Sequence, residues 1–174
     1  MMDFVSLLDQ HARTQPQRLA LRAAGQDWSY AALADASRRA ATMLHQQGVR
    51  AGDRVALLCL NTPGFVFALF GAWRLGAAVV PINHKLQAPE VDYILGHARI
   101  KLCLVDGTLA PLARRIQAAV DWLATDSAAD GMASFDTLLA QAAPLACPLG
   151  WPATRSPESS SCVIPCRAPP PANC

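Results

Sequence analysis

The sequence predicts an α/β fold, a layered parallel β-sheet with flanking helices. Short, continuously apolar runs such as VALLCL at 55–60 are typical of strands buried on both faces of a parallel sheet. Segments with apolar residues at helical spacing alternate with these runs along the chain. The joints between them are short and rich in Gly, Pro and Asn, as turns are. Alternating strands and helices favour a parallel sheet covered by helices.

Length and composition limit the function classes. The chain has 174 residues, of which 52% are hydrophobic and 16% charged, and its net charge is +2. This length suits one domain with or without a tail, and the charge is too small to indicate nucleic-acid binding. The N-terminus carries Asp3 and Asp9 where a secretion signal needs a basic region. We therefore expect a cytoplasmic protein.

Turn and helix-capping residues mark the ends of the first predicted elements. The segment DFVSLLDQHARTQ has a helical spacing of apolar residues and stops near Pro16. RLALRAAGQDWSY indicates a strand, a turn at Gly25 and a return. Ser29 is a suitable N-cap for the helical run AALADASRRAATMLHQQ, which Gly48 closes. Its apolar face is predicted to comprise Leu33, Ala36, Ala40, Met43 and Leu44.

Residues 55–83 raise the question of a membrane span, because Arg74 is their one charged residue. The run is interrupted by Asn61-Thr62-Pro63-Gly64, and Thr62 can cap a helix that tolerates proline in its first turn. That helix, 65–75, is roughly 17 Å long against roughly 30 Å for a bilayer core. The pattern therefore predicts a strand–helix–strand unit of a soluble sheet, and a membrane protein anchored through residues 55–83 is a further alternative.

The pattern then repeats. PEVDYILGHA predicts a helix, and RIKLCLVD predicts a buried strand that ends at Asp106. APLARRIQAAVDWLA, residues 110–124, is predicted to be a helix, as is SFDTLLAQAA at 134–143. Phe65, Trp73 and Trp122, at helical spacing, are expected to belong to the core.

Residues 144–174 differ in composition from the rest of the chain. They are rich in proline, serine and cysteine and show no periodicity, which predicts a disordered tail beyond a domain at 1–143. The cysteines at 162, 166 and 174 lack the paired knuckles or histidines of a zinc site. Cys59 and Cys103 lie in apolar strands, where cysteine behaves as a small hydrophobe.

Three motifs, in this order and spacing, resemble the N-terminal part of the AMP-forming acyl-CoA synthetases, members of the acyl-adenylate-forming superfamily. The motifs are Gly52-Asp53-Arg54-Val55, Asn61-x-Pro63-x-Phe65-Val66 and Gly76-Ala77-x-Val79-x-Pro81-x-Asn83. The resemblance covers about residues 4–143. It implies an incomplete N-terminal subdomain of an adenylate-forming enzyme.

The resemblance also implies a reaction. In the family a carboxylate attacks ATP to give an acyl-adenylate, and coenzyme A then takes the acyl group, with Mg²⁺ assisting. A fatty-acid or related carboxylate–CoA ligase is favoured within the family, so the expected partners are a small carboxylate and CoA. The family's phosphate-binding loop, rich in Ser, Thr and Gly, and its C-terminal lysine have no counterpart here. No lysine follows Lys101. We therefore expect the chain to be inactive alone and to need no cofactor.

We hypothesise that a frameshift shortly before Cys166 produced the tail. Read from the third base of the Cys166 codon, the codons for Cys166-Arg167-Ala168-Pro169-Pro170 permit Ser-Gly-Thr-Thr, the core of the missing loop. The nucleotide sequence tests this reading.

We assign no catalytic, cofactor-binding or metal-ligating residue. Asn61 and Asn83 follow buried strands, where ligands bind in open α/β sheets, but turn formation explains them better. His84 and Lys85 are expected in a solvated loop. The serines at 156, 159, 160 and 161 lack an organised base. The alternative function is a non-catalytic α/β binding domain, associating for example with a full-length copy.

Overall fold

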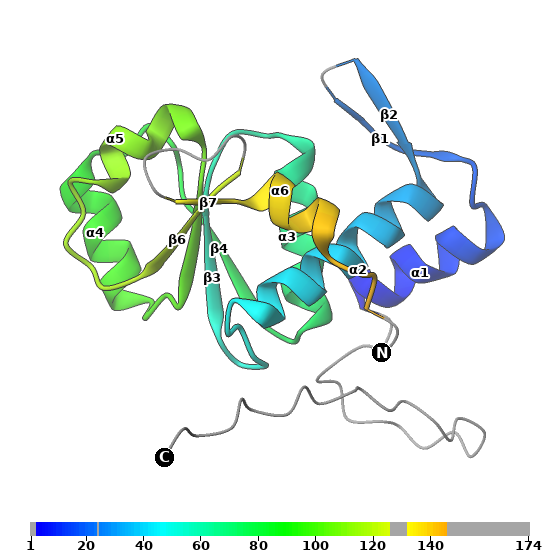
Figure 1. The fold of residues 1–174 in the computed structure, drawn as a ribbon, viewed down its shortest axis with the longest axis horizontal. Helices are drawn as coiled ribbons and strands as arrows, with labels where there is room; N and C mark the ends of the chain where they lie inside the picture. Colours follow the sequence, from blue (N-terminus) through cyan, green and yellow to red (C-terminus); the bar gives the residue numbers. More distant parts are fainter. Residues whose placement is uncertain (1–2, 24, 126–131, 146–174) are drawn as a thin grey trace, which may run out of the picture.

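Five parallel strands form the centre of the protein in the order β4-β3-β5-β6-β7 (Figure 1). The computed structural model describes residues 3–23, 25–125 and 132–145. The strands are β3 (Arg54–Leu58), β4 (Ala78–Pro81), β5 (Leu102–Val105), β6 (Asp121–Ala124) and β7 (Ala133–Ser134). In the register of the sheet, Val55 lies between Val79 and Leu102. The predicted parallel α/β fold is confirmed.

Helices cover both faces of this sheet, and a hairpin lies beside them (Figure 1). One face carries α1 (Phe4–Thr14), α2 (Tyr30–Gln46), α3 (Pro63–Arg74) and α6 (Phe135–Gln141). The other carries α4 (Ala88–His97), the short 3-10 turn η1 (Gly107–Leu109) and α5 (Ala110–Ala113). The antiparallel hairpin consists of β1 (Leu19–Ala23) and β2 (Gln26–Ser29).

The predicted caps and turns form as the sequence indicates. The Ser29 hydroxyl accepts a hydrogen bond from the Ala32 N–H at 3.3 Å, and the Thr62 hydroxyl accepts one from the Phe65 N–H at 3.3 Å. Gly25 has φ +75° in the hairpin turn, and Gly48 has φ +87° after α2. These left-handed conformations favour glycine because it has no Cβ. Local side-chain chemistry thus sets the bounds of α2 and α3.

The apolar stretch at 55–83 is strand, helix and strand, as predicted. Its helix α3 has 12 residues, and no helix among residues 3–23, 25–125 and 132–145 is long and apolar enough to cross a membrane. Arg74, 5% exposed, is buried on the helix-rich face of the sheet. Its Nη2 and Nη1 donate to the two Asp9 carboxylate oxygens at 2.6 and 2.9 Å, and its Nε donates to the Ser37 hydroxyl at 2.8 Å.

Helices α2 and α3 touch almost backbone to backbone. A Cβ added at Gly71 of α3 would lie 2.7 Å from the Ala40 Cβ and 3.0 Å from the Ala41 backbone nitrogen. Cβ atoms do not approach other atoms so closely in close-packed interiors. Glycine at this position therefore determines how near the two helices lie.

The predicted helix at 110–124 is wrong. Helix α5 covers only Ala110–Ala113, and Asp121–Ala124 is strand β6, parallel to β5. The Asp92 carboxylate accepts hydrogen bonds from the Gln117 and Ala118 N–H groups at 2.8 and 2.7 Å, which holds the intervening chain in a non-helical turn. Pairing with β5 then gives hydrogen-bond partners to the backbone N–H and C=O groups at the buried edge of β5. This tertiary interaction overrides the local helical pattern.

Trp122 consequently packs on the α4–α5 face from a strand, not from a helix. Phe65 packs against the core of the opposite face, as expected. Trp73 is half-buried there, with its ring centroid 5.4 Å from that of the exposed Phe4. Phe65 and Trp122 are thus partly buried and pack against the two cores, whereas Trp73 contacts Phe4 and Phe70 and belongs to neither core.

Candidate functional site

The topology of the sheet creates a crevice at the carboxyl ends of its strands. From β3 the chain passes through α3 on one face to β4, and from β5 it passes through η1 and α5 on the other face to β6. The loops that leave β3 and β5 therefore turn to opposite faces of the sheet. Ligands of open α/β proteins bind in the crevice that such a reversal leaves.

A pocket of about 420 Å³ occupies this position. It is lined by residues that follow three strands, by the start of α3 and α6, and by the hairpin. The lining residues are Gln26, Trp28, Leu60, Thr62, Pro63, Gly64, Phe67, Asp106, Thr108, Thr125 and Asp136. Its volume lies within the range of about 300–1,000 Å³ that is usual for small-molecule sites.

The Asp106 side chain connects the chain segments that follow β3, β5 and β6 at the base of this crevice. It directly follows β5 and is 5% exposed. Its carboxylate accepts hydrogen bonds from the Leu60 N–H, after β3, and from the Thr125 hydroxyl, after β6, both at 2.5 Å. One side chain thus links the carboxyl ends of three adjacent strands. Because buried carboxylates need such donors, the two bonds also explain why an acid is tolerated here.

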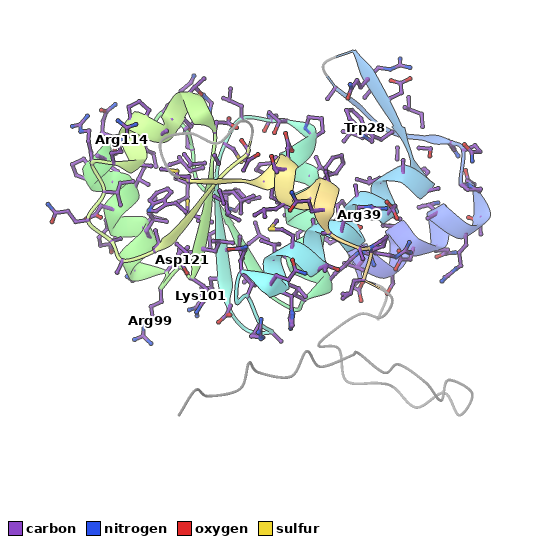
Figure 2. All side chains as sticks on the ribbon, in the orientation of Figure 1. Trp28, Arg39, Arg99, Lys101, Arg114 and Asp121 are labelled. Atoms are coloured by element: carbon purple, nitrogen blue, oxygen red, sulfur yellow. The ribbon has the colours of Figure 1, made fainter. Side chains whose placement is uncertain are left out.

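Aromatic rings form one wall of the crevice. Trp28 belongs to β2 and meets Phe67 of α3 edge to face, with ring centroids 5.9 Å apart. Figure 2 shows Trp28 at the end of the sheet opposite Lys101 and Asp121, which mark the amino ends of the strands. The hairpin therefore completes a site whose other components come from the sheet and its loops.

The ionisable side chains that line the crevice within the described ranges are acidic. Two of the lining residues are aspartates, and no Lys, Arg or His lines the pocket within the described ranges. Burial, together with the negative charge of Asp106, raises the pKa of the adjacent Cys59 thiol to about 12. Burial similarly raises the pKa of the Cys103 thiol on the opposite face. Both thiols are therefore protonated at neutral pH, which agrees with their predicted role as small hydrophobes.

These residues do not fit the phosphates of ATP or a magnesium ion. Phosphates are commonly bound by cationic side chains, whereas the ionisable side chains that line the crevice within the described ranges are carboxylates. No group of three or more His, Cys, Asp or Glu side chains that could hold a metal is found among residues 3–23, 25–125 and 132–145. The described part of the chain therefore provides a negatively charged, partly aromatic pocket with hydroxyl groups.

The asparagines singled out in the sequence lie outside this pocket. Asn61 is exposed on the loop after β3 and is not a lining residue. Asn83 makes a turn in which its Oδ1 accepts a hydrogen bond from the Lys85 N–H at 3.0 Å, and His84 and Lys85 are exposed. The serines at 156–161 and the cysteines at 147, 162, 166 and 174 lie outside the described residues.

Sequence analysis missed Asp106 and Trp28 as site residues. The signal for Asp106 was present, since an acid directly follows an apolar strand at the edge where ligands bind. The sequence holds no comparable signal for Trp28, because only the packing of the hairpin against α3 brings it to the crevice.

A family model described as "AMP-binding enzyme" matches residues 8–164. The chain belongs to this family. Two curated relatives agree with it. A crotonobetaine/carnitine–CoA ligase of Salmonella paratyphi A is 39% identical over 90 residues, which are 52% of this chain and 17% of that protein. The long-chain-fatty-acid–CoA ligase FadD13 of Mycobacterium tuberculosis is 37% identical over 113 residues, which are 61% of this chain and 22% of that protein. The chain thus spans less than a quarter of these relatives.

Solved structures of the family have the same fold. The N-terminal domain of FACL13 from Mycobacterium tuberculosis has a TM-score of 0.74 and 32% identity, over 83% of this chain and 37% of that one. A benzoate CoA ligase from Burkholderia xenovorans LB400 has a TM-score of 0.77 over 85% of this chain and 30% of that one, and at 24% identity it supports the fold alone. The similarity of the chain is therefore to the N-terminal part of AMP-forming acyl-CoA synthetases.

Proposed function

We propose that this chain is the N-terminal portion of an ATP-dependent ligase that converts a carboxylic acid to an acyl-adenylate and then to an acyl-CoA. The observation that carries the proposal is the family match over residues 8–164. The two curated relatives act on different acids by name, one on crotonobetaine or carnitine and the other on long-chain fatty acids. Family membership by itself therefore leaves the acid open.

The contribution of these residues to such an enzyme is a scaffold and one wall of a small-molecule site. The crevice at the carboxyl ends of β3, β5 and β6 has the position that open α/β sheets use for ligands. We propose that other segments supply the phosphate chemistry, which agrees with the lack of cationic side chains in the pocket lining within the described ranges. ATP, Mg²⁺ and CoA belong to the full-length enzyme in this proposal.

The 174-residue chain is proposed to be inactive alone. It contains no Ser-Gly-Thr-Thr-Gly stretch and no lysine after Lys101, so it lacks groups that stabilise the charge developing on the α-phosphate. We expect no carboxylate-dependent release of pyrophosphate from ATP by the purified chain. A coupled pyrophosphate assay with a panel of short and long acids measures this. Pyrophosphate release that depends on an added acid, with the chain alone, would contradict the proposal.

A frameshift just before Cys166 is proposed as the origin of the tail. The family match ends at residue 164, which places the end of the similarity beside the codons that permit Ser-Gly-Thr-Thr in another frame. Sequencing the gene through this region is expected to reveal that series, followed by the remainder of a ligase. A chain with the frame restored is then expected to release pyrophosphate with an acid, in contrast to the original chain. A different amino-acid series in that frame would end the idea.

The alternative, a non-catalytic binding domain, is favoured by one observation: the described residues already form a pocket without the rest of a ligase. Titration with ATP distinguishes the alternatives for the nucleotide. Micromolar binding of ATP by the 174-residue chain would indicate a nucleotide-binding module, whereas the charge of the crevice predicts no such binding.

A further inference from the structure

We propose that the crevice at the carboxyl ends of β3, β5 and β6 binds an organic ammonium group. If the chain is part of a carboxylate–CoA ligase, its acid then carries an amine or a trimethylammonium substituent. This inference deepens the proposed function and rests on it for the identity of the reaction, but the binding site itself is defined by the described residues alone.

The pocket is lined by a buried carboxylate. Asp106 is 5% exposed and lies in the lining of the pocket, and no Lys, Arg or His lines the pocket in the described part of the chain. Its two hydrogen bonds, from the Leu60 N–H and the Thr125 hydroxyl, come from neutral donors, so they leave its negative charge in place. Because a partly enclosed site screens charges less than water does, a cation gains there and an anion is repelled.

The pocket also has an aromatic wall. Trp28 lines the same pocket and is held by its edge-to-face contact with Phe67. The π face of tryptophan attracts ammonium groups, and tryptophan is the best of the aromatic side chains in this role. A carboxylate and a tryptophan lining one pocket are a suitable pair for a group that is both positively charged and apolar, as a trimethylammonium group is.

Three threonines contribute to the lining of the pocket. The hydroxyl groups of Thr62, Thr108 and Thr125 belong to the lining, but the Thr62 hydroxyl already accepts from the Phe65 N–H and the Thr125 hydroxyl donates to Asp106. Two of the three hydroxyl groups therefore already have hydrogen-bond partners within the protein. In this proposal the reacting carboxylate of the acid lies outside the pocket.

The test compares two probes of the same shape. Choline carries a trimethylammonium group, and 3,3-dimethyl-1-butanol replaces its nitrogen by carbon and is neutral. We expect the 174-residue chain to bind choline about tenfold more tightly than the neutral probe at equal ionic strength, measured by ligand-observed NMR titration. Pyrophosphate serves as the anionic probe and is expected not to bind. Equal binding of the two isosteres, binding of pyrophosphate, or no binding of choline would each overturn the proposal.

Variants locate the binding site. Asp106→Asn keeps the shape of the side chain and removes its charge, so choline affinity is expected to fall to that of the neutral probe. Trp28→Leu is expected to weaken choline binding severalfold and to leave the neutral probe nearly unchanged. The matched control is Asp121→Asn, which removes an exposed carboxylate at the opposite end of the sheet (Figure 2) and is expected to have no effect.

Folding of each variant is checked by its urea midpoint, since Asp106 also ties three strands together. If Asp106→Asn does not fold, Trp28→Leu and the isostere pair decide the outcome. Equal choline affinity in wild type and Trp28→Leu would then refute the site. Absence of choline binding leaves the ligase reaction intact, because acids without an ammonium group stay open as substrates. Failure of the frame-restored chain to release pyrophosphate would instead refute the reaction and leave choline binding standing.

Discussion

The two faces of the sheet are built differently. On one face α2 and α3 contact each other as well as the sheet, and α1 packs against α2 (Figure 1). That face contains the close approach at Gly71 and the buried Arg74. On the other face α4 and the four-residue α5 cover a smaller core of aliphatic side chains. Where helices pack on other helices as well as on the sheet, the structure needs small residues at the close contacts and ion pairs for buried charges. Where a helix packs only on the sheet, it needs only apolar residues along the side that faces the sheet.

The largest expected effect comes from breaking the Asp9–Arg74 ion pair, which lies on the face covered by α1, α2, α3 and α6. Asp9→Ala removes the carboxylate that binds Arg74, whose side chain is 3% exposed. It leaves a buried cation without its counter-ion, and we expect a loss of about 3 kcal/mol in the free energy of unfolding. Urea titration measures this loss. The control is Asp27→Ala, which breaks an exposed pair with Arg22 and is expected to change almost nothing. Equal effects of the two substitutions would refute the structural role of Arg74.

The second effect compares a glycine from each face. Gly71→Ala forces a methyl group against Ala40 and the backbone of Ala41, and we expect a loss of about 2 kcal/mol in the free energy of unfolding. Gly96→Ala in α4 places the same methyl group where nothing lies within 4 Å. It should stabilise the protein by about 0.5 kcal/mol, because alanine is the better helix former. Opposite signs in the two urea titrations are the expected outcome, and equal signs would remove the distinction between the faces.

The smallest effect concerns pH. Burial alone would raise the pKa of Asp9, but its hydrogen bonds to Arg74 and the charges of Arg74, Arg38 and Arg13 outweigh burial and lower it. A carboxyl group whose pKa is lowered by folding stabilises the protein above its unfolded pKa, about 3.8. That stabilisation is lost as the pH falls through the folded pKa. We expect the difference in stability between wild type and Asp9→Asn to be full at pH 7 and to shrink below about pH 4. A difference that stays constant down to pH 3 would contradict this account.

Much of the fold is readable from the sequence because it depends on local chemistry. Ser29 and Thr62 begin their helices as expected, and the apolar runs became strands β3 and β5. The error at 110–124 arose because Trp122 and Leu123 suit the buried face of a helix as well as a strand, and periodicity alone does not separate the two in a short apolar run. Only the neighbouring β5 edge and the Asp92 contacts distinguish them.

The candidate site was less accessible to sequence reasoning. Asn61 and Asn83 were in the right kind of place, after strands at the carboxyl edge, but their side chains face solvent or a turn. The crevice is formed instead by Asp106, by Thr125, which directly follows a strand that had been predicted as helix, and by Trp28 on the hairpin. Thr125 was missed because the strand before it had been predicted as helix. Trp28 was missed because the hairpin is distant in sequence from the strands that form the crevice.

By itself the sequence determined the kind and order of most elements, their caps and the family motifs, since these depend on residues within one or two turns of each other. The tertiary structure alone decided the contacts that shape the molecule. Leu60 and Asp106 are separated by 46 positions, and Asp9 and Arg74 by 65. Such pairs form only when the burial of many other side chains has offset the entropy of closing the chain between them, and no local pattern encodes that balance.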